Sequence, residues 1–190
     1  MGEKKQQSLI PAPPYGPRGF QVLMRVEFRP AIASDVDALA ALERETFESD
    51  RISRTSFHRL LRRRSAATIV ARSDASLAGY ALLLFRERTS AARLYSLAVD
   101  KAFAGIGLGR ALLAQAEELA AQRGCRELRL EVRLDNMKAR ALYEKAGYTL
   151  FGRRDSYYSD GEAALRYRKA LTPRRGRSSR LERPQLGTAR

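Results

Sequence analysis

The chain has 190 residues, of which 44% are hydrophobic and 30% are charged, and it carries a formal net charge of +15 at pH 7. This length and composition fit one globular domain with short appendages and exclude a mainly disordered chain. The sequence has no run of 18 apolar residues, which excludes a membrane-spanning helix, and a single histidine, which argues against a metal site. Its one cysteine, Cys125, cannot form an internal disulfide and fits a reducing compartment. From the cysteine we expect a cytoplasmic protein, and from the lack of an apolar run we expect no membrane contact.

Both ends of the chain differ in composition from the middle. Residues 1–24 are rich in Gln, Pro and Gly without periodicity, which predicts a flexible leader, and Met24 is a second candidate start of translation. Residues 172–190 contain six arginines and one glutamate, which predicts a disordered basic tail. Residues 25–171 carry a charge of +8 and are expected to form one domain. A basic surface of this size attracts anions, but it also simply keeps a protein soluble.

The first half of this domain combines helical periodicity with strand-like apolar runs. In chain order these patterns predict a strand over 25–30, a helix that begins at Ser34 and Asp35, a helix over 55–64, and two strands over 67–72 and 77–87. A turn at 73–76 joins the last two strands into a hairpin. Arg62, Arg63 and Arg64 form a cationic cluster at the end of the second helix, where positive charge complements the helix dipole.

The second half alternates strands and helices. The patterns predict a strand over 93–99, a helix over 108–122, a strand over 127–133, a helix over 136–145, and two strands over 148–154 and 163–171. Gly124 and Gly147 end the two helices. A hairpin-rich first half followed by this alternation predicts an α/β (α+β) fold in which helices pack on a mixed sheet.

The stretch AFAGIGLGRALL connects a predicted strand to a predicted helix and contains Gly105, Gly107 and Gly109. A glycine loop at a helix N-terminus offers unpaired N–H groups and a positive dipole end to an anion. A Walker loop is excluded because Arg110 and Ala111 follow the last glycine. A dinucleotide-binding fold is disfavoured because Arg110 replaces the third small residue of its motif and few strands follow. The three glycines therefore predict that the backbone of this loop lies in close contact with a ligand of another kind.

The segment from Val99 to Leu113 resembles motif A of the GNAT N-acetyltransferases. In that family the sequence Gln/Arg-x-x-Gly-x-Gly/Ala binds the pyrophosphate of acetyl-coenzyme A (acetyl-CoA), and here Ala104 replaces the first residue, which removes a side chain and leaves the backbone donors. The resemblance implies that the cofactor contacts the backbone of β-strand residues along its pantetheine arm, the glycine loop and one asparagine. These residues are Leu97, Ala98, Val99, Gly105, Ile106, Gly107, Leu108, Gly109, Arg110 and Asn136.

A second motif follows at the family's spacing. LEVR at 130–133, Asn136 and ARALYEKAG at 139–147 resemble the ribosomal-protein-alanine N-acetyltransferases within the GNAT family. The resemblance covers about residues 26–171 and implies a mostly antiparallel central sheet of about seven strands flanked by about four helices. It also implies acetyl-CoA as co-substrate, no metal, and a primary amine as acceptor, above all the α-amino group of a protein or peptide N-terminus.

The same resemblance assigns proton-transfer roles to two residues. Glu131 corresponds to the general base, and Tyr143 corresponds to the acid that protonates the departing thiolate. From the residues alone, Glu131 also fits a solvated strand position and Tyr143 also fits a packed helix face. Asn136 equally fits a helix N-cap, while Tyr157 and Tyr158 either shape the acceptor site or pack near a strand end.

Other functions are open at this point. The acceptor could be a small amine or a lysine side chain, and the charge of +8 fits poorly with a strongly cationic acceptor. A non-catalytic RNA- or ribosome-binding module on the same fold is the alternative from another class, although no aromatic–basic RNA-recognition signature occurs. The basic tail could also give an enzyme a weak nucleic-acid or ribosome contact. Nothing in the sequence indicates the oligomeric state.

Overall fold

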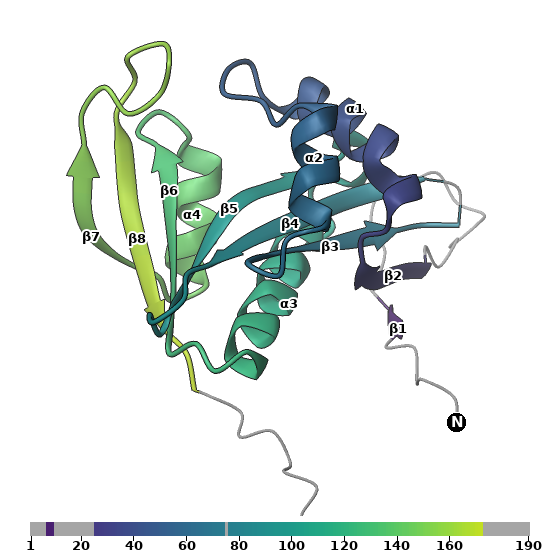
Figure 1. Cartoon of the computed structure of the whole chain (residues 1–190). Helices are drawn as coiled ribbons and strands as arrows, with labels where there is room; N and C mark the ends of the chain where they lie inside the picture. The colour runs from purple at the N-terminus through teal and green to yellow at the C-terminus, as the bar shows by residue number, and fades with distance from the viewer. Residues whose placement is uncertain (1–6, 10–24, 75, 173–190) are drawn as a thin grey trace, which may run out of the picture.

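One mixed sheet of eight strands organises the chain in the computed structural model, which describes residues 7–9, 25–74 and 76–172 (Figure 1). The strands lie in the order β1-β2-β3-β4-β5-β6-β8-β7, and all neighbours are antiparallel except the parallel pair β5 and β6. The strands are β1 (Gln7–Leu9), β2 (Arg25–Pro30), β3 (Ala66–Arg72), β4 (Leu77–Phe85), β5 (Ala91–Val99), β6 (Glu127–Arg133), β7 (Thr149–Arg154) and β8 (Ala164–Ala170).

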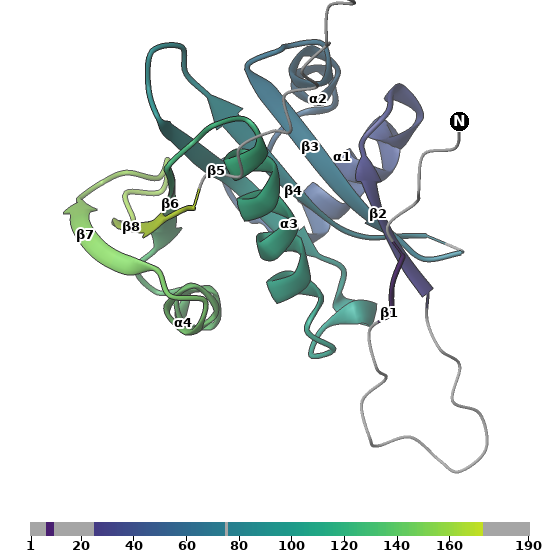
Figure 2. The ribbon, with the colours of Figure 1, turned by 90° about the horizontal axis from the view of Figure 1, so that it is seen from below.

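Helices cover both faces of this sheet (Figures 1 and 2). They are α1 (Val36–Thr46), α2 (Arg54–Leu61), α3 (Leu108–Gln122) and α4 (Met137–Lys145), with short 3₁₀ turns η1 (Ala33–Asp35) and η2 (Lys101–Phe103). Successive residues of a strand point to opposite faces. Val70 therefore packs in the core beneath α1 and α2, whereas its neighbours Ile69 and Ala71 pack in the core beneath α3 and α4.

Local sequence signals explain where several elements begin and end. The Ser53 side chain accepts a hydrogen bond from Ser56 N and so caps the N-terminus of α2. Gly107 and Gly124 flank α3 with φ values of 84° and 81°, a region that glycine enters without a steric penalty. The α2 ring of Phe57 is fully buried and meets the Tyr80 ring edge-to-face at 5.7 Å, which fixes α2 on the sheet.

The predicted fold class is confirmed, and several bounds coincide with the sequence patterns. The strands predicted over 25–30 and 127–133 and the helix predicted over 108–122 have the bounds of β2, β6 and α3. The second helix is shorter than the predicted 55–64, because the chain turns at Arg63, whose carbonyl accepts a hydrogen bond from Ala66 N at the start of β3. The hairpin strand predicted over 77–87 ends at Phe85.

The ends of the chain require one correction. The composition predicts a flexible leader over residues 1–24, but residues 7–9 form β1, in which Ser8 pairs with Val26 of β2. Such pairing uses backbone groups at the edge of a sheet, which composition does not reveal. The rest of the leader and the predicted disordered tail beyond Thr172 lie outside the described residues. No helix in the described part of the chain has both the length and the apolar character to cross a membrane.

Candidate active site

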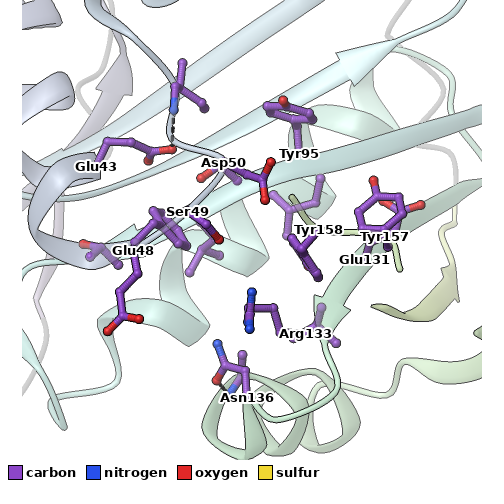
Figure 3. A pocket seen from close by; sticks show the side chains of 18 of the residues that line it. Glu43, Glu48, Ser49, Asp50, Tyr95, Glu131, Arg133, Asn136, Tyr157 and Tyr158 are labelled. Atoms are coloured by element: carbon purple, nitrogen blue, oxygen red, sulfur yellow. Dashed lines mark hydrogen bonds between the residues drawn. The ribbon is translucent and has the colours of Figure 1, made fainter. Parts of the chain in front are cut away.

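The parallel strands β5 and β6 pair over only part of their length. Their ladder joins residues 91–94 to residues 127–130. Beyond this point β5 stays paired with β4 as far as Val99, and β6 stays paired with β8 as far as Arg133. The two strands therefore separate, and a cleft of about 770 Å³ lies at the opening. Its walls come from β5, β6, α1, α4 and the loops that follow α1 and β7 (Figure 3).

A β-bulge at Tyr95 accompanies the separation. In the β4–β5 ladder Leu82 pairs with Ser96 and Leu83 pairs with Leu94, so Tyr95 is the extra residue. Bulges increase the twist of a strand and are common beside functional sites. Beyond the bulge, the edge of β5 that faces β6 has no ladder partner within the described residues, so backbone groups of residues 97–99 on this edge are not used by the sheet, and Leu97 lines the cleft.

Glu131 lies near the end of β6, in the wall of the cleft. Its side chain is 15% exposed, so it is partly shielded rather than fully solvated. One carboxylate oxygen, Oε2, accepts a hydrogen bond from Arg93 Nε at 2.7 Å. The other oxygen, Oε1, lies 3.8 Å from Arg166 Nε, which is beyond hydrogen-bond distance. Glu131 is thus fixed by a hydrogen bond to one oxygen, whereas its second oxygen accepts no hydrogen bond within the described residues and forms only a longer ion pair with Arg166.

Arg93 connects three elements around this carboxylate. From β5 it pairs with Glu131 on β6, and a second guanidinium nitrogen donates to the Tyr157 hydroxyl in the β7–β8 loop at 2.5 Å. The guanidinium also lies 5.2 Å from the centre of the Tyr95 ring. A planar guanidinium with several donors is suited to hold two acceptors in fixed directions.

Tyr143 faces the cleft from α4 and is 7% exposed. Its ring also contacts the Tyr148 ring edge-to-face at 5.8 Å, so the residue packs in the core and lines the cleft at once. Burial, followed by the neighbouring Tyr158, raises the pKa of the Tyr143 hydroxyl above its usual value. The phenol therefore keeps its proton at neutral pH and can donate it.

Two loops meet at the mouth of the cleft. Asp50, in the loop after α1, accepts hydrogen bonds from Ser159 N at 3.0 Å and from Ser159 Oγ at 3.2 Å, and Ser159 belongs to the β7–β8 loop. In the same loop Tyr157 and Tyr158 form an edge-to-face pair at 5.1 Å, and burial raises the pKa of Tyr158 to about 12. Arg133 of β6 lies over the Tyr158 ring (Figure 3). Both tyrosines therefore line the cleft, as the acceptor-site interpretation requires.

A buried carboxylate lies behind the loop that follows α1. Glu43 is 2% exposed, and it accepts hydrogen bonds from Ile52 N at 3.0 Å and from the Tyr80 hydroxyl. The Tyr80 hydroxyl also lies 2.7 Å from Ser96 Oγ on β5. Burial raises the pKa of the Glu43 carboxyl. Glu43 thus ties the loop that carries Asp50 to the floor of the cleft.

The lining of the cleft is acidic although the chain as a whole is strongly basic. Six carboxylates and two arginines line it: Glu43, Glu48, Asp50, Glu131, Asp135, Asp160, Arg93 and Arg133. This charge distribution favours a cationic or amine ligand. The net charge of the domain therefore does not describe this cleft, and the argument from net charge against a cationic acceptor does not apply to its lining.

The glycine loop lies at the N-terminus of α3, next to α4 rather than in the lining of the cleft. Gly105 and Gly107 have φ values of 82° and 84°, and a Cβ added to either would meet no atom within 4 Å. Gly109 is helical, and an added Cβ would lie 3.5 Å from Leu142 of α4. Gly107 offers no side chain to cap the helix, so no N-cap side chain occupies the first N–H groups of α3. This donor set fits an anionic phosphate group.

The structure distributes the other predicted cofactor residues over different environments. Leu97 lines the cleft, Val99 packs against the core beneath α3, and Ala98 is buried beneath α1 and α2, so only backbone groups of these residues are suited to bind a ligand. Asn136 lines the cleft, and its Oδ1 accepts a hydrogen bond from Ala139 N at 3.0 Å. The helix-cap interpretation of Asn136 therefore holds, and its side-chain nitrogen is left for another partner.

Comparison with known proteins identifies the family of this site. A model of the Acetyltransferase (GNAT) family matches residues 35–148, which is more than half of the chain. The chain belongs to the GNAT acetyltransferase family. The predicted family and the predicted N-acetyltransferase activity are thus confirmed, and GNAT enzymes use acetyl-CoA as acetyl donor. Among the described residues of this GNAT enzyme, no group of three or more His, Cys, Asp or Glu side chains could hold a metal ion.

Individual proteins similar to this chain include N-acetyltransferases whose names specify a ribosomal protein alanine or an α-amino group. Over 132 residues the chain is 34% identical to a Bacillus subtilis protein provisionally named ribosomal protein bS18-alanine N-acetyltransferase, covering 69% of this chain and 86% of the relative. Over 128 residues it is 35% identical to the N-alpha-acetyltransferase RimI of Mycobacterium tuberculosis, covering 66% and 79%. The crystal structure of the ribosomal-protein-S18-alanine N-acetyltransferase from Escherichia coli is similar with a TM-score of 0.69 at 26% identity, covering 80% and 97%.

Several residues of the site have no counterpart in the sequence-based expectations, among them Glu43, Arg93 and Asp50. Glu43 lies seven residues after Val36, on the apolar face of α1. A charged residue within this apolar stripe is the sequence signal that could have identified it. Arg93 gives no such signal, because its partners Glu131 and Tyr157 lie 38 and 64 residues away. Asp50 likewise meets Ser159 only through the fold.

Proposed function

We propose that this protein transfers the acetyl group of acetyl-CoA to the N-terminal α-amino group of a protein or peptide. The observation that carries the proposal is the position of Glu131 and Tyr143 on the same acidic cleft, at the point where β5 and β6 separate. The names of the relatives, which specify a ribosomal protein alanine or an α-amino group, support the same acceptor class.

The residues suited to hold the co-substrate lie beside the cleft. The backbone N–H groups of residues 105–110 at the start of α3 are suited to the pyrophosphate, even though Ala104 offers no polar side chain. The free edge of β5 at residues 97–99 is suited to the pantetheine arm, and the side-chain nitrogen of Asn136 to a further polar group. When bound there, acetyl-CoA supplies a reactive thioester.

Two side chains divide the proton transfers. Glu131 Oε1 has no hydrogen-bond partner in the described part of the chain and accepts the proton of the incoming ammonium, directly or through one water. Tyr143, whose pKa is raised by burial, returns a proton to the departing thiolate. Arg93 keeps Glu131 in place, and the Tyr157 and Tyr158 rings shape the entrance for the acceptor.

Physical chemistry favours an α-amino group over a lysine. The reference pKa is about 7.7–8.0 for an α-amino group and about 10.4 for a lysine side chain. Near pH 7, the neutral nucleophilic form is therefore roughly 200- to 400-fold more abundant for the α-amino group than for the lysine side chain. The acidic lining attracts either acceptor in its cationic form, so charge alone does not choose between them.

A matched set of peptides tests the acceptor. One peptide begins with a free alanine and lacks lysine; its counterpart has a blocked N-terminus and one internal lysine; a third reaction offers a small diamine. We expect acetylation of the free N-terminus alone, measured as CoA release and located by mass spectrometry. Faster turnover of the blocked peptide or of the diamine would identify a lysine or small-amine acetyltransferase instead.

A further inference from the structure

Three loops at one end of the sheet form a cluster of exposed arginines, here called the arginine pole. They are the turns after α2, between β4 and β5, and after α3, and they contribute Arg62, Arg63, Arg64, Arg86, Arg88, Arg123 and Arg126. Backbone hydrogen bonds join the loops: Phe85 N donates to Ser65 O at 2.8 Å, and Arg126 N donates to Ser90 O at 2.7 Å. The β4–β5 turn and the ends of α3 and β8 lie together at the lower edge of Figure 1, away from the loops around the cleft.

The arginine pole holds most of the net positive charge of the domain. Its three loops contain seven arginines and one acidic residue, Glu87, and so carry a formal charge of +6. Residues 25–171 carry +8 in total. The remainder of the domain is therefore close to neutral, and the basic character predicted from composition is concentrated at one site rather than spread over the surface.

This positive charge is not neutralised by neighbouring acids. Across the described residues, no carboxylate lies within ion-pair distance of any of the seven arginines. Helix C-termini account for Arg62, Arg63, Arg64 and Arg123, which follow α2 and α3. They do not account for the arginines of the β4–β5 turn or for Arg126.

The C-terminal segment leaves the domain at the same end. Leu171 N donates to Arg126 O at 2.8 Å, so the chain beyond β8 begins at the arginine pole. Residues 172–190 add a charge of +5 in the sequence. Together the pole and this segment carry +11 of the net +15, all joined to one end of the molecule.

The pole is separate from the candidate active site. The glycine loop lies before α3 and Arg123 lies after it, and a helix of 15 residues is about 22 Å long. The pole therefore cannot contribute to the cradle proposed for the pyrophosphate. The cleft, in turn, has an acidic lining and would repel a polyanion.

We propose that the arginine pole binds RNA through its phosphate backbone. A guanidinium can donate two parallel hydrogen bonds to phosphate oxygens, and an array of arginines without carboxylate partners fits a regularly spaced polyanion. Of the seven, Arg123 donates to the Arg64 carbonyl at 3.2 Å and lies over the Phe85 ring, which holds its guanidinium at the junction of the three loops. The exposed large hydrophobic residues Ile32, Tyr95, Met137 and Leu150 all lie outside the three loops, which argues against insertion into a membrane surface. Among residues of the three loops there is also no exposed aromatic ring for base stacking, so the contact is independent of sequence.

The preference for RNA over DNA rests on the proposed function, because protein N-termini first become available at the RNA-rich ribosome. The binding itself is independent of acetyl transfer. It is measured without acetyl-CoA, so an inactive preparation that still binds RNA would refute the proposed function and leave the arginine pole in place.

The test uses the full chain and a fluorescent RNA duplex of about 20 base pairs, with binding followed by anisotropy at several salt concentrations. The variant Arg62→Gln/Arg63→Gln/Arg64→Gln removes three charges from the pole. We expect it to weaken binding at least about 10-fold and to reduce the slope of log Kd against log salt by about two to three. The control Arg44→Gln/Arg153→Gln/Arg154→Gln removes equal charge from exposed positions outside the pole and should bind like the parent.

Three outcomes would overturn the proposal. Equal losses in the two triple variants would show that diffuse charge, not the pole, attracts RNA. Tighter binding of a DNA duplex of the same length would identify the wrong nucleic acid. Binding to vesicles that contain phosphatidylglycerol, without binding to RNA, would identify a membrane surface. Both variants should acetylate a short peptide at the parental rate, because neither changes the cleft.

Discussion

Arg93 and Glu131 form an ion pair at the junction of β5 and β6, with 2.7 Å between Arg93 Nε and Glu131 Oε2. The pair lies where the strands separate, and the same guanidinium donates to the Tyr157 hydroxyl. One side chain thus orients both the proposed base and a ring of the proposed acceptor site. Arg93 is therefore a positioning residue: it acts on the reaction through Glu131 and Tyr157.

Replacing Arg93 tests this role. We expect Arg93→Met to lower kcat/KM for peptide acetylation about 10- to 100-fold, because small misplacements of a catalytic group are costly. Arg93→Lys should recover part of the loss, since an ammonium keeps the charge but cannot hold two acceptors in a fixed fork. CoA affinity, measured by calorimetry, should not change. The control Arg129→Met breaks the pair with Glu127 and the contact with the Phe151 ring, all of which lie outside the lining of the cleft, and it should be fully active. Parental activity in Arg93→Met would contradict the role.

The proposed base is tested by an isosteric change. Glu131→Gln should lower kcat about 10²-fold, the usual scale for a positioned general base, with little effect on Tm or CoA affinity. Raising the pH should restore part of the rate, because more of the acceptor then arrives as the neutral amine. Glu127→Gln lies on the same strand outside the cleft and serves as the control. A Glu131→Gln variant with parental turnover across the pH range would remove Glu131 from the mechanism.

The proposed acid has a natural control in Tyr148, whose ring contacts the Tyr143 ring. Tyr143→Phe removes a hydroxyl that faces the cleft and should lower kcat with the fold intact, whereas Tyr148→Phe removes one outside the lining. Both changes keep the 5.8 Å ring contact, so packing is matched. Because burial raises the Tyr143 pKa, the phenol stays protonated and the loss should not vary between about pH 6 and 9. Steady-state kinetics of the two variants decide the matter, and equal activities would leave Tyr143 with packing alone.

Sequence patterns predict the parts of this enzyme that depend on local chemistry. The bounds of α3 follow from its apolar periodicity and from Gly124, and the bounds of β6 follow from the alternation in ELRLEVR. The resemblance to GNAT motifs then leads to Glu131 and Tyr143, which the structure does bring to one cleft. Each of these inferences needs only residues that are close together in the chain.

Features that depend on long-range contacts could not be predicted in this way. The pair between Arg93 and Glu131 requires β5 and β6 to be parallel neighbours that separate after four residue pairs, and no local pattern encodes that register. The negative charge of the cleft lining could not be predicted either, because a net charge of +15 does not say where on the molecule the charged residues lie. In the structure, six carboxylates line the cleft, whereas the seven arginines of the arginine pole lie at the other end of the domain.

Gly107 and Gly124 have the same backbone conformation, so substituting each in turn distinguishes the effect of backbone strain on stability from an effect on CoA binding. Gly107 and Gly124 have φ values of 84° and 81°, and at neither would a Cβ meet an atom within 4 Å. Alanine at either position should therefore cost a similar amount of stability, about 1–2 kcal/mol. Gly107→Ala should in addition weaken CoA binding, because it distorts the start of α3, whereas Gly124→Ala lies at the far end of that helix. Calorimetry with CoA and thermal unfolding measure the two effects; equal CoA affinities would place the cradle elsewhere.

The buried carboxylate of Glu43 predicts a pH-dependent stability. Burial raises its pKa in the folded state, so the folded protein binds this proton more tightly than the unfolded chain. The free energy of unfolding must then fall as pH rises from the unfolded-state value, about 4.3, through the higher folded-state value. Glu43→Gln removes the titration and keeps an acceptor for Ile52 N. Its stability relative to the parent should therefore increase with pH, measured by urea unfolding at about pH 4.5 and about pH 7.5.

Two further variants make the Glu43 experiment decisive. Glu43→Ala leaves Ile52 N and the Tyr80 hydroxyl without this acceptor and should lose about 1–3 kcal/mol at both pH values. Glu45→Gln changes an exposed charge on the same helix and controls for the general effect of charge on α1. Because Glu43 anchors the loop that carries Asp50, Glu43→Ala should also raise KM for the peptide more than it lowers kcat. A stability difference for Glu43→Gln that is the same at both pH values would mean that the carboxyl does not titrate in this range.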